Sequence, residues 1–323
     1  MSSMEKVQAT MTIEMMKKQA KQAKRKKVAG NIVVSIVRWI FMLGMCFVVL
    51  YPLFQHVMTS FMSIEDKYDN SVIFIPKNWN FNNYYNPNSP ANAFEGLGGW
   101  QSFINTFILA LVCSLLQVLC STLVGYGLAR FKFKLNGLVF VFVIIAMLLP
   151  PDLLFASRYS MFSKLDLIGD SMVPMFCFAV TCTGLKSSLY IFMMRQFFKG
   201  QPKELEEAAY VDGAGPLRTF WSIMLPGAVA MMVTVFLFSF VWQWLDTTYT
   251  TIFCQNMSLI STQYTHLTLH GGIGQMLAHD AAIGSSLIAN AGMVLIIIPL
   301  IVLYAFGQRF FVESISRSGM TGM

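Results

Sequence analysis

Residues 103–129 read FINTFILALVCSLLQVLCSTLVGYGLA, and they contain no charged side chain. A helix rises 1.5 Å per residue, so about 20 apolar residues cross the ~30 Å hydrocarbon core of a membrane. Lipid cannot bond to backbone N–H and C=O groups, which a helix satisfies internally. Five further apolar runs lie near residues 32–58, 137–159, 172–196, 224–253 and 285–308. None alternates like a barrel strand, so the sequence predicts an all-α integral membrane protein with six transmembrane helices.

The charged residues are few and unevenly placed. Hydrophobic residues make up 55% of the chain and charged ones 12%, about half the charged share of an average soluble domain. Of the 23 Lys and Arg residues, seventeen fall in residues 1–31, 130–136, 195–223 and the segment after residue 308. The positive-inside rule places those segments and both termini in the cytoplasm. The net charge of +7 is therefore a topology signal, and we expect no nucleic-acid partner.

The predicted spans divide the chain into a tail, a membrane domain and a second tail. Residues 1–31 form a basic cytoplasmic tail, either a helix on the membrane surface or a solvated segment. Residues 32–312 form the transmembrane domain, with an extracellular loop at 60–101 and a cytoplasmic loop at 197–226. Residues 313–323 form the cytoplasmic C-terminal tail.

The cytoplasmic loop carries the most informative local pattern, QPKELEEAAYVDGAGPLRTFWSIMLP over residues 201–226. Pro202 suits the first turn of a helix. Three acidic residues suit its positive N-terminal dipole: Glu204, Glu206 and Glu207. Gly213 suits the left-handed residue that ends the helix, and Pro216 suits the start of a second short helix. From these residues alone, a docking element and an amphipathic interfacial loop are equally good interpretations.

The spacing within this loop resembles a known family. Glu207-Ala208-Ala209, then Gly213, Ile223 and Leu225-Pro226 reproduce the EAA loop of ABC importer permeases, in particular the carbohydrate subgroup of maltose-type permeases. Further stretches are similar to the same family: Asn105-Thr106, Tyr126–Phe131, Pro150-Pro151, Arg195–Phe198 and Gln308–Val312. The resemblance implies the type I ABC importer permease fold, with the EAA segment as a cytoplasmic coupling helix.

The resemblance also implies the role of each coupling residue. Glu207 would face basic groups of an ATPase subunit, Ala208 and Ala209 would sit in its cleft, and Gly213 would set the turn, with Asp212 as a further coupling residue. Glu207→Lys or Gly213→Asp would then uncouple transport while leaving membrane insertion intact.

The implied assembly contains several other chains. A second, homologous permease subunit would complete a heterodimer, two ATPase subunits would dock beneath it, and an extracellular solute-binding protein would deliver a sugar or oligosaccharide. ATP and magnesium would bind to the ATPase subunits, so this chain would hold no cofactor. The implied location is a bacterial or archaeal plasma membrane, in contact with lipid. The alternatives are a permease for a different polar solute and a self-sufficient secondary transporter.

Two groups of residues are candidates for the solute pathway. Lys186 is the deepest cation in a predicted span, and such charges normally face a bundle interior or water. If the helix instead begins later, Lys186 lies near the outer interface. Trp242, Gln243 and Trp244 supply aromatic faces and an amide for sugar hydroxyls, or they form an interfacial tryptophan belt. Relatives usually have Trp-Asn at this point, so the sequence departs from the family after Trp242.

Other site motifs are absent from the sequence. No G-x-x-x-x-G-K-[ST] loop, zinc-type cysteine spacing or G-x-S-x-G motif occurs. We therefore expect a translocation subunit without catalytic residues, driven by ATP hydrolysis on another chain. His266 and His270 are four residues apart, but Gly271, Gly272 and Gly274 favour a loop at the end of that segment, and we expect no metal site.

Overall fold

The computed structural model describes residues 3–87, 92–183, 186–274 and 279–320, and every regular element among them is a helix. The chain divides into two compact units, residues 1–58 and 59–323. The first unit is α1 (Ser3–Ser60) without its last turn. The helical backbone of the first predicted span thus continues back through most of the basic tail, and the Val34–Ser60 portion is long and apolar enough to cross a membrane.

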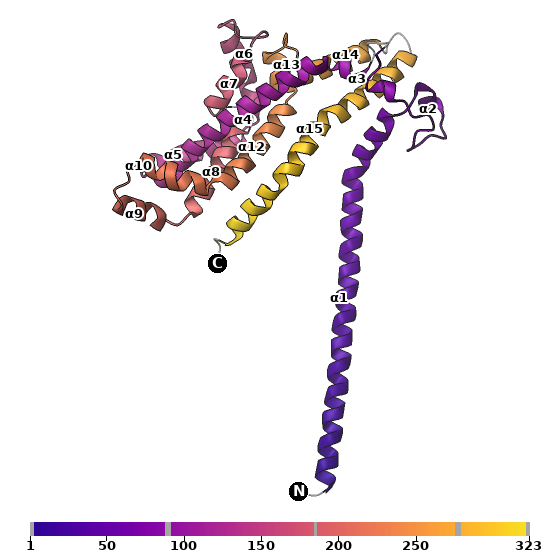
Figure 1. Cartoon of the computed structure of the whole chain (residues 1–323), viewed down its shortest axis with the longest axis vertical. Helices are drawn as coiled ribbons and strands as arrows, with labels where there is room; N and C mark the ends of the chain where they lie inside the picture. Colours follow the sequence, from indigo (N-terminus) through magenta and orange to yellow (C-terminus); the bar gives the residue numbers. More distant parts are fainter. Residues whose placement is uncertain (1–2, 88–91, 184–185, 275–278, 321–323) are drawn as a thin grey trace. The chain divides into compact units, whose positions relative to one another are not determined.

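Helix α4 (Gly99–Arg130) organises the second unit (Figure 1). It packs against α7 (Val173–Val180), α8 (Ser187–Gly200) and α12 (Val229–Trp244). Gly125 permits the close approach of α4 and α8, because a Cβ atom there would lie 2.7 Å from the Cβ of Met194. The contact is too tight for any residue but glycine.

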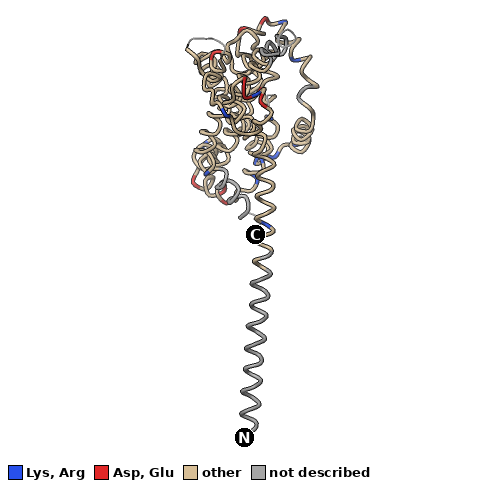
Figure 2. Tube along the Cα trace, turned by 90° about the vertical axis from the view of Figure 1, so that its right-hand side faces the viewer, with Lys and Arg blue, Asp and Glu red and all other residues tan. Residues whose placement is uncertain are grey.

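Helix α15 (His279–Met320) lies along α12, and α14 (Ile260–Gly274) packs against α15. Shorter elements connect the long helices: α2 (Ile64–Tyr68), η1 (Phe81–Asn83), α3 (Ala93–Gly96), α5 (Asn136–Leu148), η2 (Pro151–Leu154), α6 (Phe155–Ser163), α9 (Glu204–Val211), α10 (Pro216–Thr219), η3 (Phe220–Met224), α11 (Leu225–Gly227) and α13 (Thr248–Phe253). Figure 2 shows long stretches of the second unit's trace without a charged residue, as the hydropathy pattern requires.

Not every apolar run forms a single straight helix. Among the described residues, three helices are long and apolar enough to span a membrane: Val34–Ser60, Gly99–Arg130 and Ile283–Phe310. A fourth span results if Pro216–Gly227 and Val229–Trp244, bent by 73°, are counted together. The number of six spans therefore remains a prediction.

Two of the predicted spans contain breaks with clear causes. The 137–159 run ends its first helix at Leu148, because Pro150 and Pro151 supply no backbone N–H to continue it. The 172–196 run is interrupted between α7 and α8, where Cys182 and Lys186 have positive φ angles of 56° and 57°. Left-handed residues cannot continue a right-handed helix.

In the extracellular loop expected at 60–101, side-chain bonds to the backbone hold residues 60–83 together. The buried Asp66 accepts from the backbone N–H of Asn78 at 2.9 Å, and the Asn83 amide donates to the carbonyl oxygen of Met62 at 2.9 Å. On its surface the Lys77 ammonium lies 2.6 Å from Asp69. Hydrogen bonds from Lys77 and Ser71 hold the pKa of the Asp69 carboxyl well below its usual range.

One local expectation differs from the structure. The α14 helix continues through Gly271 and Gly272 to Gly274 instead of ending in a loop, since glycine weakens a helix by only about 1 kcal/mol per residue and does not forbid it. The α15 helix also continues beyond residue 312, as far as Met320, so its backbone includes most of the expected C-terminal tail.

Candidate functional site

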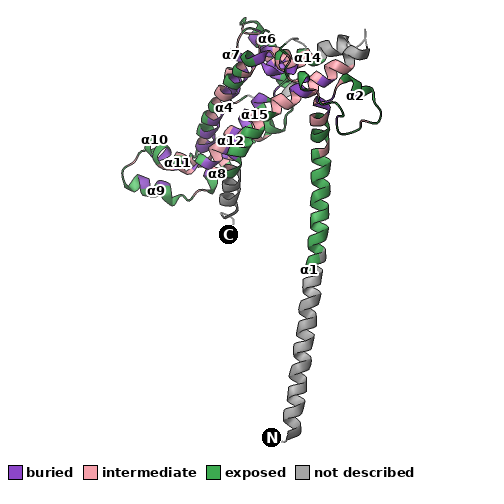
Figure 3. Ribbon diagram, turned by 45° about the vertical axis from the view of Figure 1, so that its right-hand side comes forward, coloured by how far each residue is buried: buried purple, intermediate pink, exposed green. Residues whose placement is uncertain are grey.

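The predicted coupling loop folds as a helical arm, here called the coupling segment (residues 201–227). Helix α9 runs over Glu204–Val211, a turn follows, and α10, η3 and α11 lead into α12. Figure 3 shows α9 and α10 beyond the ends of α8 and α11. Pro202 lies before α9 rather than in its first turn, because Lys203 is the N-cap residue.

Gly213 ends α9 with the predicted left-handed turn. Its φ angle is +79°, the Ala214 N–H donates to the carbonyl oxygen of Ala209 at 2.9 Å, and the Gly213 N–H donates to that of Tyr210 at 3.1 Å. These two bonds are those of a Schellman motif, which satisfies carbonyls at the end of a helix. After this turn the chain continues through α10, η3 and α11 into α12.

The five predicted coupling residues divide by exposure. Glu207, Ala208, Asp212 and Gly213 are exposed, whereas Ala209 is buried against the rest of the segment. Large apolar side chains are exposed beside them: Val211, Leu217 and Trp221 have exposed fractions of 88%, 76% and 55%. An arm that combines acidic residues with exposed apolar residues has the composition of a protein-contact surface.

The coupling segment is held to the end of α4 by a residue that the motif did not single out. The carboxylate oxygen Oε1 of Glu206 accepts from the Tyr126 hydroxyl at 3.1 Å and lies 3.5 Å from Nε of Arg130. Nη2 of Arg130 also donates to the carbonyl oxygen of Gln201 at 2.8 Å. The Arg130 and Glu206 side chains are 5% and 11% exposed. This group, the α4 anchor, joins α9 directly to a long membrane helix.

Helical spacing gives a partial signal for the α4 anchor. Tyr126 and Arg130 are four residues apart, and Glu206 and Ala209 are three apart, so each pair shares one helix face. The sequence cannot show that those two faces meet.

The structure brings two predicted pathway residues together. Nζ of Lys186 lies 4.8 Å from the ring centroid of Trp242, a cation–π distance. Lys186 is the N-cap residue of α8, so the helix begins after it. Because α8 has 14 residues, Lys186 lies about 21 Å along the axis from the C-terminal end of α8.

The other two predicted pathway residues point into the protein. Gln243 is buried, and Trp244 is buried with its indole N–H donating to the carbonyl oxygen of Ile296 in α15 at 3.1 Å. The Trp244 ring also stacks on Phe240 at 5.8 Å. The geometry therefore gives Trp244 a packing contact between α12 and α15, and its part in a solute pathway remains a prediction.

A cavity of about 170 Å³ lies at the break between α7 and α8. Its walls include Arg158, Thr183, Lys186 and Ser187, with apolar residues of α5 on another side. The Arg158 guanidinium lies 5.3 Å from the Phe178 ring and donates to the Tyr249 hydroxyl at 3.0 Å. We call this space the α7–α8 cavity.

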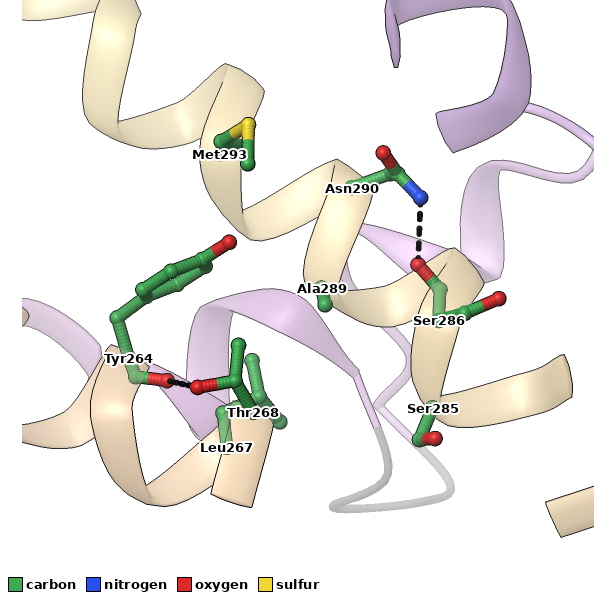
Figure 4. Close-up of a pocket in the computed structure, with 8 residues that line it drawn as sticks. All are labelled: Tyr264, Leu267, Thr268, Ser285, Ser286, Ala289, Asn290 and Met293. Carbon is green, nitrogen blue, oxygen red and sulfur yellow. Dashed lines mark hydrogen bonds between the residues drawn. The ribbon is translucent and has the colours of Figure 1, made fainter. Parts of the chain in front are cut away.

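A second cavity, of about 270 Å³, lies between α14 and α15 (Figure 4). Its polar groups serve their own helices: Asn290 donates to the carbonyl oxygen of Ser286 at 2.7 Å, and Thr268 donates to that of Tyr264 at 2.9 Å. Burial raises the pKa of the Tyr264 phenol. This cavity thus combines an aromatic ring with hydroxyl and amide groups that are already bonded.

Metal-ligating side chains do not gather in the part of the chain that the structure describes: no group of three or more His, Cys, Asp or Glu side chains has the required proximity. The side chains of His270 and His279 lie outside the described residues.

The chain is similar to known transport proteins. The family profile described as "Binding-protein-dependent transport system inner membrane component" matches residues 121–317. The probable ABC transporter permease protein YurM of Bacillus subtilis is 26% identical over 285 residues, covering 88% of each chain. The arabinooligosaccharides transport system permease protein AraQ of Halalkalibacterium halodurans is 25% identical over 292 residues, covering 89% of this chain and 98% of AraQ.

The fold is also that of a solved transporter. A chain in the crystal structure of a bacterial ABC transporter involved in the import of the acidic polysaccharide alginate aligns with a TM-score of 0.65 and 18% identity. The alignment covers 87% of this chain and 98% of that one. At this identity the likeness concerns the fold.

Proposed function

The chain belongs to the family of binding-protein-dependent transport system inner membrane components, and from this premise we propose that this ABC importer permease carries a sugar or oligosaccharide into the cell. The similarity to AraQ, which is named for arabinooligosaccharide transport and aligns over nearly its whole length, supports a saccharide. The absence of a phosphate-binding loop from the sequence supports a subunit that relies on ATP hydrolysis by another chain.

The proposed assembly has this chain as one half of a permease heterodimer. Two ATPase subunits dock on its cytoplasmic face and hold ATP and magnesium, and a solute-binding protein docks outside. Six spans place both termini in the cytoplasm, as the basic residues favour.

The coupling segment is the proposed receiver of the ATPase motion. Glu207 and the exposed Val211 and Leu217 offer charge and apolar area to a partner. The α4 anchor then carries the displacement of α9 to α4, which packs against α8 and α12. Such coupling requires that the two ATPase states contact the segment differently. The α4 anchor is the observation that carries this mechanism, because it gives the moving arm a rigid connection into the membrane helices.

The solute pathway is proposed to pass the break between α7 and α8. Trp242 is 45% exposed and offers a ring face for a sugar, and Lys186 beside it offers N–H donors. Trp244 contributes by fixing α12 against α15.

The test is transport by the purified assembly in vesicles. The chain is co-purified with the second permease, the ATPase subunits and the binding protein, and ATPase stimulation is measured across a panel of glycans. We expect stimulation by saccharides and loss of uptake in Glu207→Lys, with the exposed Glu204→Lys of the same helix as the matched control. Stable uptake by this chain without an ATPase would overturn the proposal, as would equal loss in both variants.

A further inference from the structure

Resting on the proposed function, we infer that the α7–α8 cavity binds an anionic group of the transported solute, so that the saccharide carried is an acidic one with a carboxylate or a phosphate ester. The proposal joins two cations, one unsatisfied buried hydroxyl and one helix N-terminus that line the same 170 Å³ space.

The charge lining the cavity is positive. Arg158 and Lys186 both contribute to its wall, and within the described ranges neither forms an ion pair, since the ion pairs found there are Lys77–Asp69 and Arg130–Glu206. Aromatic rings hold both cations: Trp242 lies under Lys186, and Phe178 and Tyr249 lie beside Arg158. Rings fix the position of a cation without neutralising it, and only one of the five N–H groups of Arg158 donates to the Tyr249 hydroxyl among the described contacts. The two charges therefore remain available to one anion.

Ser187 supplies an independent sign of a missing ligand. Ser187 is one of the residues that line the cavity, it is 3% exposed, and its hydroxyl has no hydrogen-bond partner within the described part of the chain. Buried hydroxyl groups are nearly always bonded, because an unmade bond costs about 1–3 kcal/mol. An acceptor oxygen within reach of this hydroxyl would satisfy it.

The first turn of α8 adds the field of a helix N-terminus. The Tyr190 N–H donates to the carbonyl oxygen of Lys186 at 3.2 Å, so the amides of Ser187, Ser188 and Leu189 lie at the N-terminal end of α8. Ser187, Ser188 and Leu189 all border the cavity. Free amides and the helix dipole both favour a negative group there.

An anionic group of the solute fits the two cations and the helix N-terminus at the α7–α8 cavity better than a neutral hydroxyl does. A hydroxyl would accept one or two of these bonds but leave both positive charges uncompensated. A carboxylate or phosphate offers several acceptor oxygens and cancels charge. Because a lipid headgroup phosphate has the same chemistry, the experiment separates it from the solute.

The first measurement compares two saccharides that differ only in charge. The full complex, with its binding protein and ATPase subunits, is reconstituted in phosphatidylcholine vesicles and supplied with digalacturonate or its dimethyl ester. We expect the KM for the acid to be at least tenfold lower than for the ester. Lys186→Gln and Arg158→Gln should each raise the acid's KM about tenfold or more and leave the ester's within twofold, whereas the exposed Lys164→Gln should change neither. Equal KM values in the wild type, or equal effects of the variants on both saccharides, would overturn the inference.

The second measurement tests the charge preference of the cavity without measuring transport. Cys182 borders the cavity, so a complex in which it is the only cysteine is treated with methanethiosulfonate reagents of negative and positive charge. We expect faster reaction with the anionic reagent, a ratio that falls about tenfold in Lys186→Gln, and protection by digalacturonate. An unchanged ratio, or protection by phosphatidylglycerol but not by digalacturonate, refutes the solute site. If no saccharide stimulates the ATPase while the preference for the anionic reagent persists, the proposed function is wrong and the anion-binding character of the cavity is still supported.

Discussion

Removing the Glu206 carboxylate should release the coupling segment from α4. In Glu206→Ala the Arg130 guanidinium loses the carboxylate 3.5 Å away, and the Tyr126 hydroxyl loses its 3.1 Å acceptor. Because the Arg130 side chain is 5% exposed, water cannot replace the lost partner fully. Breaking a buried pair by removing one member costs roughly 3–5 kcal/mol. We use the lower figure, about 3 kcal/mol, because this ion pair is long and lies at the end of α4.

The assay is amide hydrogen exchange of α9 in the assembled complex. At 1.4 kcal/mol per factor of ten, about 3 kcal/mol predicts a roughly 140-fold loss of protection for amides such as Asp212, which bonds to the carbonyl oxygen of Ala208 at 3.1 Å. Protection in the middle of α4 should not change, because local opening of the arm leaves that helix packed. Uptake per ATP hydrolysed should fall together with the protection of the α9 amides.

The matched control is Glu204→Ala, which removes an exposed carboxylate from the same helix. Protection of α9 in this variant should change by less than about fivefold, since exposed charges contribute about 1 kcal/mol or less. The reasoning is refuted if Glu206→Ala leaves α9 protected, or if Glu204→Ala opens it to the same extent. A double variant that also replaces Arg130 by Met should recover part of the loss, because no buried charge is then left unpaired.

Two further substitutions test the backbone geometry. Gly213→Val should lower uptake per ATP roughly 5- to 30-fold, because a left-handed conformation at φ +79° costs an ordinary residue about 1–2 kcal/mol; Gly213→Asn, which tolerates that conformation, should retain most coupling, and equal loss in both would contradict this account. Gly125→Ala should lower the thermal unfolding midpoint of the complex, since the added Cβ would lie 2.7 Å from Met194 and overpacking costs about 1–3 kcal/mol. Gly127→Ala is its control, because the nearest atom to a Cβ there is 4.0 Å away in Phe131. A midpoint lowered by Gly127→Ala but not by Gly125→Ala would contradict this account.

The backbone geometry of the candidate coupling segment was predictable because its signal is local. The turn after α9 depends on one residue that adopts a positive φ angle, and Gly213 provides it whatever surrounds the segment. The breaks near Pro150 and Pro151 follow equally from a missing backbone donor. The break at Cys182 and Lys186 has no such signal, because neither residue type favours the left-handed conformation that it adopts.

The predicted pathway residues show what a local sequence pattern cannot predict, namely which side chains face the interior. Trp242, Gln243 and Trp244 are consecutive, so all three looked equally suited to a sugar. In the folded chain Trp242 is exposed beside Lys186, whereas Trp244 donates to the Ile296 carbonyl oxygen in the core. Successive residues of a helix point about 100° apart, and only the neighbouring helices decide which direction is the interior.

The sequence by itself determined the membrane character, the helical class and the place of the coupling segment. These depend on hydropathy summed over some 20 residues and on the conformational limits of Gly and Pro, which act within a few residues. Only the tertiary structure decided that Glu206 meets Arg130, that Lys186 lies over Trp242, and that Arg158 and Ser187 share a cavity with Lys186. The physical reason is that a helix apolar on every side carries no stripe to mark its buried face, so the pairing of faces is settled by packing among helices distant in the chain.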